Sequence, residues 1–216
     1  MPELRGKKVL ITAGPTHEPI DPVRFISNHS SGKMGIAIAE EAVANGAEVT
    51  LICGPSNVKS SKEINRINVQ SAQNMFDAVM AEQQEYDVLI LSAAVADYRP
   101  KFVAENKIKK KDTQLTIELE STPDIVAALG SKKREDQVLV GFALETNNEL
   151  ENAKGKLTKK NCDLIVLNSL QDAGAGFGHD TNKVSILDRH NNISTFELKS
   201  KAEVAKDILR TIIAFK

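Results

Sequence analysis

The amino-acid sequence predicts an α/β protein built on a doubly wound, Rossmann-like parallel sheet. Short runs rich in Val, Ile and Leu alternate along the chain with segments whose apolar residues recur at helical spacing. That alternation is typical of strands buried on both faces of a parallel sheet. The chain has 216 residues, 41% of them hydrophobic, which is enough for one sizeable core, and no linker-like stretch divides it. We therefore expect a single domain over residues 1–216.

Six apolar runs are the candidate strands of this sheet. They are residues 7–14, 47–54, 64–69, 86–95, 137–144 and 162–169, of which 64–69 is the weakest. Between the first two, Met34, Ile38 and Ala42 follow the i, i+4 spacing of a helix that Gly46 would end. Further helices are expected at residues 74–84, 123–133, 148–161 and, as an amphipathic one, 200–215. Ligands of such a sheet bind beyond the carboxyl ends of its strands.

Two segments depart from the alternation of strand and helix. Residues 114–121 alternate apolar and polar side chains like a half-exposed strand, and residues 183–198 resemble two such strands around a polar turn at Asn191 and Asn192. We expect these segments to form a small antiparallel β appendage, where a homodimer contact could be made.

Charge and cysteine content exclude several classes of protein. The chain has 28 basic and 29 acidic residues, so its formal charge of -1 gives no overall attraction to nucleic acid or to a membrane. No uncharged apolar run is long enough for a membrane span, and no signal peptide is evident. Cys53 and Cys162 have neither metal-ligand spacing nor the density of a secreted scaffold. We expect a cytoplasmic protein without nucleic-acid or membrane partners.

Residues 15–35, between the first strand and its helix, form a long polar segment that fits neither common glycine pattern. A dinucleotide-binding protein needs an acidic residue near the end of the second strand, where Cys53 and Gly54 stand. A Walker phosphate loop would need glycine at Ser27 and Ser or Thr at Met34. Ordinary NAD binding and a P-loop are therefore disfavoured.

The end of this segment favours binding of an anion or a nucleotide. Ser30, Ser31 and Gly32 stand at a helix N-terminus, where backbone amides and the helix dipole attract negative charge. The serines could instead only cap the helix. Capping alone does not explain the other polar side chains of the same region, which are Arg24, Asn28, His29 and Lys33.

Five motifs in order resemble bacterial phosphopantothenoylcysteine synthetase, also called phosphopantothenate–cysteine ligase, the ligase domain of bifunctional coenzyme A biosynthesis proteins. They are AGPTHEPIDPVRFISNHSSGKMG, SAAVADYRP, NKIKK, STPDIVA and VGFALETNN. The resemblance runs from Val9 to about Lys206 and is weakest in the last third. It implies a ligase domain that joins 4'-phosphopantothenate to L-cysteine: CTP, with Mg²⁺, would convert the carboxylate to an acyl-cytidylate and release pyrophosphate, and the cysteine amine would then displace CMP.

The resemblance also implies roles for individual residues. Asn28 matches a catalytic asparagine whose amide can donate to the acyl oxygen, although asparagine also forms turns. Arg24 matches an arginine near the acyl and phosphate groups, with a surface ion pair as its alternative. Lys107 matches a lysine that acts on the nucleotide phosphates and in acyl transfer, whereas Lys110 and Lys111 are expected to be solvated surface.

Nucleotide contacts are implied along several elements. Small residues after the strand at 86–95 would let a base or sugar approach the backbone. Lys156 and Lys160, one helical turn apart, can face one anion together. Phe142 would lie against the base or be an ordinary core residue. The implied contacts are Ser30, Ser31, Gly32, Ser92, Ala93, Ala94, Asp97, Lys107, Pro123, Asp124, Ile125, Val126, Phe142, Lys156 and Lys160.

No side-chain cluster with metal-ligand spacing is apparent, so magnesium is expected to arrive with the nucleotide, near Asp97. Residues 109–113 could be a flap that shields the reactive intermediate from water.

The resemblance to the family also implies a homodimer. In many relatives this domain is fused to or associated with a flavin-dependent decarboxylase, and no flavin is expected in this domain. His17 and Leu144 stand where the family usually has other residues. Eukaryotic relatives use ATP in place of CTP. The alternatives are a Rossmann-like NAD(P)-dependent oxidoreductase and a non-catalytic nucleotide sensor.

Overall fold

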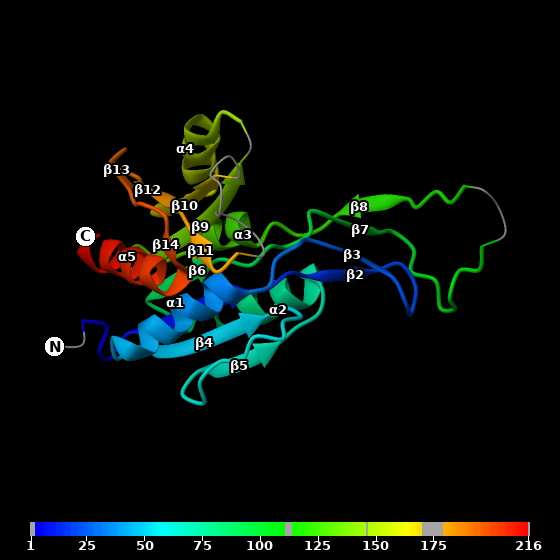
Figure 1. Ribbon diagram of the computed structural model, residues 1–216, viewed down its shortest axis with the longest axis horizontal. Coiled ribbons are helices and arrows are strands. Elements are labelled where there is room, and N and C mark those ends of the chain that lie inside the picture. Colours follow the sequence, from blue (N-terminus) through cyan, green and yellow to red (C-terminus); the bar gives the residue numbers. More distant parts are fainter. Residues whose placement is uncertain (1–2, 111–113, 146, 170–178, 216) are drawn as a thin grey trace.

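An eight-stranded, mostly parallel sheet forms the centre of the structure (Figure 1). The computed structural model describes residues 3–110, 114–145, 147–169 and 179–215. Six strands are parallel and lie in the order β5 (Asn65–Asn68), β4 (Glu48–Cys53), β1 (Lys8–Ala13), β6 (Val88–Leu91), β9 (Val138–Glu145) and β10 (Leu164–Ser169). Numbered along the chain, this is the 3-2-1-4-5-6 order of a Rossmann fold. The fold class and the six expected strands are confirmed.

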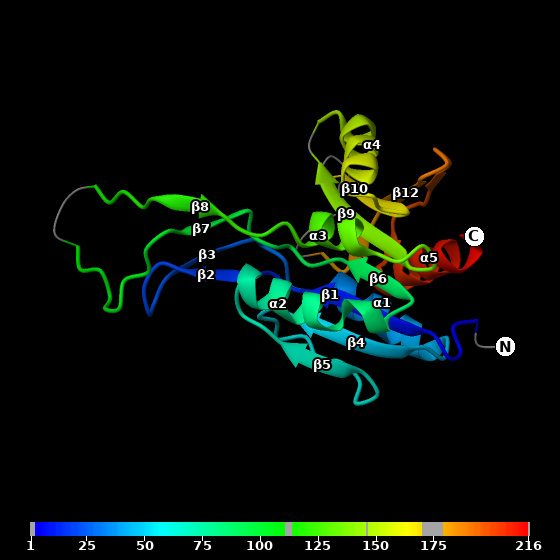
Figure 2. The ribbon, with the colours of Figure 1, turned by 180° about the vertical axis from the view of Figure 1, so that it is seen from behind.

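Helices cover both faces of this sheet (Figures 1 and 2). One face carries α1 (Lys33–Ala44) and α5 (Lys201–Ala214), and the other carries α2 (Ala72–Glu82), α3 (Ile125–Lys132) and α4 (Glu149–Lys159), with a short 3₁₀ turn η1 (Gln83–Glu85) after α2. On β1, Val9 and Ile11 pack into the first core and Leu10 packs into the second. Burial on both faces explains why β1 is continuously apolar rather than alternating.

The hairpin expected in residues 183–198 exists, but its predicted place was wrong. Strands β12 (Val184–Asp188) and β13 (Ile193–Thr195) extend the main sheet, because β12 pairs antiparallel with β10. Val184 and Ile186 pack into the core beside α1 and α5, whereas Leu187 packs into the opposite core. A strand with buried side chains on both faces belongs in the sheet, and a free appendage could not bury them.

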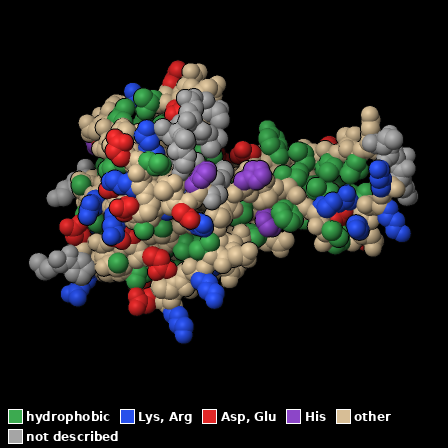
Figure 3. All heavy atoms as spheres, viewed as in Figure 1, with side chains coloured by type: hydrophobic (Ala, Val, Ile, Leu, Met, Phe, Trp, Pro, Cys, Tyr) green, Lys and Arg blue, Asp and Glu red, His purple; other side chains and the backbone are tan. Residues whose placement is uncertain are grey.

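Two short antiparallel ribbons project from the sheet as an arm (Figures 1 and 2). One pairs β2 (His17–Pro19) with β3 (Phe25–Ser27), and the other pairs β7 (Tyr98–Pro100) with β8 (Leu119–Ser121). We use "the arm" for residues 17–27, 98–110 and 114–121. Only Leu119–Ser121 of the strand expected at 114–121 is a strand. The exposed hydrophobic side chains of the arm include Val23, Phe25, Tyr98, Phe102, Val103, Leu115 and Leu119 (Figure 3).

The remaining strands are β11 (Thr181–Asn182) and β14 (Lys199–Ser200), which pair with each other just before α5. In the part of the chain that the structure describes, none of the helices has the length and apolar character needed to cross a membrane.

Candidate active site

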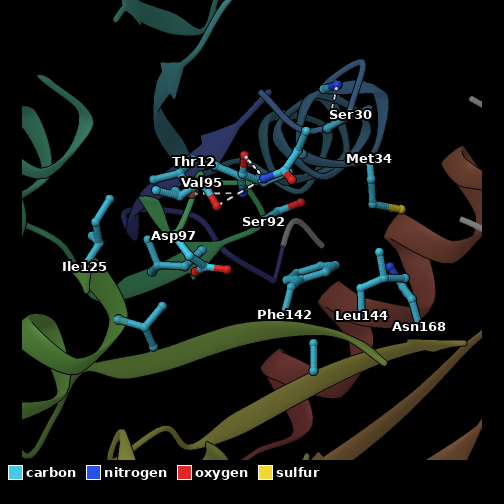
Figure 4. A pocket seen from close by; sticks show the side chains of 18 of the residues that line it. Thr12, Ser30, Met34, Ser92, Val95, Asp97, Ile125, Phe142, Leu144 and Asn168 are labelled. Atoms are coloured by element: carbon cyan, nitrogen blue, oxygen red, sulfur yellow. Dashed lines mark hydrogen bonds between the residues drawn. The ribbon is translucent and has the colours of Figure 1, made fainter. Parts of the chain in front are cut away.

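A cavity of about 870 Å³ opens at the carboxyl ends of β1, β6, β9 and β10 (Figure 4). It lies where the strand order reverses between β1 and β6, which is where open α/β sheets bind ligands. In Figure 4, Asp97 and Ile125 lie toward one side of the cavity, Phe142 lies centrally, and Met34, Leu144 and Asn168 lie toward the other. Asn28 and every predicted nucleotide-binding residue except Lys107 line this cavity.

The start of α1 is built without a side-chain cap. Gly32 is the N-cap residue and has a left-handed backbone, with φ of 81°, and within the described part of the chain α1 has no side-chain cap hydrogen bond. The Ser30 hydroxyl accepts from the Gly32 amide at 3.3 Å, while the Ser31 carbonyl accepts from Ser56 at 2.7 Å. The alternative in which the two serines cap α1 is therefore wrong, and among the described residues the first-turn amides of α1 have no acceptor, so they can bind a ligand.

The first turn of α1 packs directly on β1. A Cβ atom at Gly35 would lie 2.6 Å from the Ala13 Cβ and 2.9 Å from the Thr12 carbonyl oxygen, so only glycine fits there. Thr12 in turn accepts a hydrogen bond from the Ala93 amide at 3.2 Å. These contacts hold the end of β1, the start of α1 and the segment after β6 around one side of the cavity.

The Asn28 side chain connects the polar segment after β1 to the segment after β6 through hydrogen bonds. Its Nδ2 group donates to the carbonyls of Ala94, at 3.0 Å, and Val95, at 3.1 Å. Two carbonyl acceptors fix the orientation of the amide, because only the NH₂ end can donate to both. The amide hydrogens that we expected to donate to an acyl oxygen are thus engaged by the protein. The Oδ1 atom is the part of the side chain left to contact a ligand.

Of the lysines that reach the cavity from the end of α4, the two predicted ones, Lys156 and Lys160, each have a partner. The Lys156 Nζ atom donates to the Phe142 carbonyl at 2.9 Å, and Lys160 forms an ion pair with Asp124 at 2.9 Å. Asp124 also caps α3 by accepting from Ala127. Burial, and then the neighbouring charge of Lys160, lower the pKa of Lys156. With Lys159, which also lines the cavity, this end carries three lysines and one structural carboxylate, Asp124.

Arg24 and Lys107 do not line the cavity; both belong to the arm. The Arg24 guanidinium binds Asp21, whose side chain is fully buried, and also donates to the Ile108 carbonyl at 3.1 Å. Asp21 accepts from the Ile108 amide as well. The ion-pair alternative for Arg24 is thus what the structure contains. Of the expected flap at 109–113, residues 111–113 lie outside the described residues.

The cavity also contains residues that the sequence reasoning did not single out as a site: Thr12, Thr122, Lys159, Asn168, Asn182 and Lys201. Asn168 could have been found, since it stands at the carboxyl end of β10 as Ser92 stands just after β6. Lys201 gave no such signal, because α5 follows the short strand β14 and not a strand of the parallel sheet.

The donor atoms near the cavity suit a metal ion that is carried by phosphates. Among the described residues, no three His, Cys, Asp or Glu side chains group together as they would around a metal ion. Asp97 is an exposed carboxylate on the cavity wall, whereas Asp124 is occupied by Lys160. Mg²⁺ is commonly held by one or two carboxylates together with substrate phosphates, so Asp97 fits that role.

Comparisons with known proteins agree on one family. Residues 4–215 match the family described as DNA/pantothenate metabolism flavoprotein C-terminal domain. The chain is 56% identical over 211 residues to a protein of an unknown prokaryotic organism named cysteine/cysteine sulfinic acid decarboxylase, covering 97% of this chain and 59% of that protein. It is 49% identical over 212 residues to the coenzyme A biosynthesis bifunctional protein CoaBC of Bacillus subtilis strain 168, covering 98% and 52%.

A solved structure is similar over its whole length. The crystal structure of the C-terminal domain of the coenzyme A biosynthesis bifunctional protein CoaBC matches with a TM-score of 0.84 and 45% identity, over 99% of this chain and 97% of that one. The chain spans only 59% and 52% of the two curated relatives, so about half of each has no counterpart here.

Proposed function

This chain belongs to the family of the DNA/pantothenate metabolism flavoprotein C-terminal domain, and from that premise we propose that it is a phosphopantothenate–cysteine ligase of coenzyme A biosynthesis. Residues 1–216 would act as one catalytic unit that joins 4'-phosphopantothenate to L-cysteine. The observation that carries this proposal is the placement of Asn28, the uncapped first turn of α1 and the lysines of α4 around one cavity.

The reaction that fits this cavity has two steps. A carboxylate oxygen of 4'-phosphopantothenate attacks the α-phosphorus of CTP, forming an acyl-cytidylate and releasing pyrophosphate. The amine of cysteine then attacks the acyl carbon, CMP leaves, and the amine proton passes to the CMP phosphate or to solvent. Two reactants held side by side react far faster than the same two molecules in solution. A cavity of about 870 Å³ is large enough to hold both.

The residues of the cavity have separate tasks in this proposal. The free amides at the start of α1 bind phosphate oxygens, as helix N-termini do in other proteins. Lys156 and Lys160 add positive charge on the α4 side. Asn28 keeps the segment after β6 in position and presents Oδ1, which can accept a hydrogen bond from the attacking amine. Asp97 would hold the magnesium ion of the nucleotide, which supplies charge neutralisation of the phosphates.

Arg24 and Lys107 enter the reaction only if the arm reaches a second protomer. We propose a homodimer in which the arm of one protomer closes over the cavity of its partner. The exposed hydrophobic side chains of the arm support this arrangement, since contiguous apolar surface on a soluble protein usually marks an interface. The contacts of Asp21 support it too, because they hold Arg24 and the residue after Lys107 together.

Release of pyrophosphate tests the proposed reaction. The protein is mixed with 4'-phosphopantothenate and either CTP or ATP, with and without L-cysteine. We expect CTP to give pyrophosphate without cysteine, up to about one equivalent, and sustained turnover with cysteine. Faster turnover with ATP would contradict the CTP assignment, and an absence of pyrophosphate with both nucleotides would contradict the ligase.

Three other functions have less support. An NAD(P)-dependent oxidoreductase would use the Rossmann sheet, but β4 ends at Cys53 and is followed by Gly54, so the acidic residue that binds a ribose is missing there. A decarboxylase is suggested by the name of one relative, of which the chain covers 59%. The chain covers only 59% and 52% of two curated relatives, which supports a second unit, fused or associated, such as a flavin-dependent decarboxylase. A nucleotide sensor would bind CTP without turnover.

A further inference from the structure

The cavity has a second basic end, on the opposite face of the sheet from Lys156 and Lys160. Lys33 comes from the start of α1 and Lys201 from the start of α5, and both line the cavity. Helices α1 and α5 pack on one face of the sheet, whereas α4 packs on the other. Cations therefore flank the strand ends from both sides. The reaction proposed above involves two phosphorylated molecules, but its assigned residues leave the side of α5 without a role.

Lys201 is a buried lysine held in a fixed position. It is 8% exposed, and its Nζ atom donates to the carbonyl of His179. The preceding residue, Ser200, forms a capping box with Glu203, which fixes the start of α5. Burial and the nearby charge of Lys33 lower the pKa of Lys201, while Asp180 acts in the opposite direction. A buried ammonium beside another ammonium is expected where an anion binds.

The surroundings of Lys201 also suit an anion. Lys33 forms an ion pair with Asp180, whose side chain is 85% exposed and can move aside. The Asn168 Oδ1 atom accepts from Asn182 at 3.3 Å, which turns the Asn168 NH₂ group toward other partners. Asn168 lines the cavity at the carboxyl end of β10. Two ammoniums, an amide and the uncapped start of α1 thus line this end of the cavity, and Asp180 is the carboxylate that the described residues place beside Lys33.

We propose that Lys201, with Lys33 and Asn168, binds a phosphoryl group at the α5 side of the cavity, and that Asp180 occupies Lys33 until this group arrives. The proposal deepens the ligase function and rests on it. The phosphoryl group has two possible sources, which are the terminal phosphates of the nucleoside triphosphate and the 4'-phosphate of the acid. Both present the same dianionic oxygens to Lys201.

Calorimetric titration of the full chain tests this subsite. Inorganic pyrophosphate, CMP, CTP and 4'-phosphopantothenate are each titrated into the wild type, Lys201→Gln and Lys206→Gln. Lys206 is an exposed lysine of the same helix and serves as the matched control. We expect Lys201→Gln to weaken at least one phosphoryl ligand about 10-fold or more, the scale of a lost charge-assisted hydrogen bond, and to leave CMP unchanged. Lys206→Gln should change nothing.

The pattern of losses identifies the source. Weaker binding of CTP and pyrophosphate points to the terminal phosphates of the nucleotide, and weaker binding of 4'-phosphopantothenate alone points to the acid. Changes below about twofold for all four ligands, or equal losses for all four, overturn the proposal. If Lys201→Gln does not fold by circular dichroism, Asp180→Asn decides: it should bind pyrophosphate more tightly, and unchanged binding overturns the subsite.

The same titrations keep this inference separate from the ligase itself, because they contain no cysteine and measure no amide formation. If Lys201→Gln binds every ligand normally while the wild type forms the amide, the subsite is wrong and the ligase stands. If the wild type binds pyrophosphate through Lys201 but forms no amide, the ligase is wrong.

Discussion

The guanidinium of Arg24 binds the buried carboxylate of Asp21, with 2.5 Å between Nη2 and Oδ2. The same carboxylate accepts hydrogen bonds from the amides of Val23, Arg24 and Ile108. One side chain therefore joins the turn between β2 and β3 to the segment that follows Lys107. The arrangement gives the arm a defined shape even though much of its apolar surface is exposed.

Replacing this carboxylate should loosen the arm. Asp21→Asn has the same shape but cannot form the ion pair, and it accepts fewer hydrogen bonds. We expect hydrogen exchange at the amides of Val23, Arg24 and Ile108 to become about 10-fold faster, equivalent to about 1.4 kcal/mol. Asp136→Asn is the matched control, since Asp136 pairs on the surface with Arg134. Equal exchange rates in the wild type and Asp21→Asn would show that the Asp21 carboxylate does not stabilise the arm.

The same pair should make the arm sensitive to acid. Arg24 holds the pKa of the Asp21 carboxyl well below its usual range. A depressed pKa stabilises the folded arm fully above the unfolded value of about 3.9, and the stabilisation is lost as the pH falls below that value. Exchange protection of the Ile108 amide should therefore be constant from neutral pH down to about pH 4 and decline below it. In Asp21→Asn that decline should be absent.

Asn28 should be needed for amide formation. In Asn28→Asp a carboxylate would face the carbonyls of Ala94 and Val95, which can no longer receive a hydrogen bond from it. We expect turnover to fall about 100-fold or more, the scale of a lost positioned polar group in an active site. Pyrophosphate release and amide formation are measured in parallel. Asn68→Asp, which keeps its acceptor for Arg66, is the control, and normal turnover in Asn28→Asp would remove Asn28 from the mechanism.

Gly35 should tolerate no side chain. In Gly35→Ala the new Cβ would lie 2.6 Å from the Ala13 Cβ, so α1 must shift away from β1. We expect the free energy of unfolding to fall by about 1–3 kcal/mol and nucleotide binding to weaken. Gly155→Ala, at an exposed position of α4, is the matched control. Nothing described lies within 4 Å of the Cβ atom that it adds, so it should be neutral or stabilise the protein by about 0.5–1 kcal/mol. Equal stabilities from urea titration would show that α1 does not need this close contact.

Lys156 should make CTP binding pH-dependent below the ordinary lysine range. Its pKa is lowered by burial and by Lys160, so it loses its charge before an ordinary lysine, with a pKa of about 10.4, would do so. The Kd of CTP should therefore rise as the pH increases from neutral toward that value. Arginine stays charged, so Lys156→Arg should weaken the dependence. An identical pH profile for the two proteins would exclude Lys156 as its source.

Mixed dimers test whether the arm acts on the partner's cavity. Asn28→Asp and Lys107→Ala protomers, each inactive alone, are mixed after dissociation. If Lys107 serves the partner, each mixed dimer has one intact site, and random mixing should restore about a quarter of the wild-type activity. No recovery, with mixed dimers verified by a size tag, would place Lys107 in its own protomer or outside the reaction.

The parallel sheet could be predicted from the sequence because each of its strands carries a strong local signal. Leu10 and Ile11 are neighbours in β1 that enter opposite cores, and such continuous burial requires a continuous apolar run. The arm lacked that signal. Its strands are three residues long, and β7 and β8 pair across the intervening residues 101–118, so their pairing depends on contacts that periodicity does not report.

The residues of the candidate site likewise differ in how clearly the sequence marks them. Ser92 follows β6, Pro123 comes just before the start of α3, and Phe142 lies in the second half of β9. All three line the cavity at the carboxyl edge of the sheet, where both motif and topology place ligand-binding residues. Arg24 and Lys107 were recognised by motif alone, and the motif did not reveal that they lie outside the cavity of this chain. Neither a motif nor the end of a parallel strand marks Lys201 in the sequence, because its position depends on how α5 packs beside α1.

The contact between Gly35 and β1 also bears on how easily the protein could evade an inhibitor. A compound lodged against the first turn of α1 would face backbone atoms and a residue that cannot acquire a larger side chain without displacing the helix. Mutations that reshape this wall would damage the protein's own packing. Drug resistance should therefore arise slowly there, and more readily at positions that line the cavity with a side chain, such as Leu144.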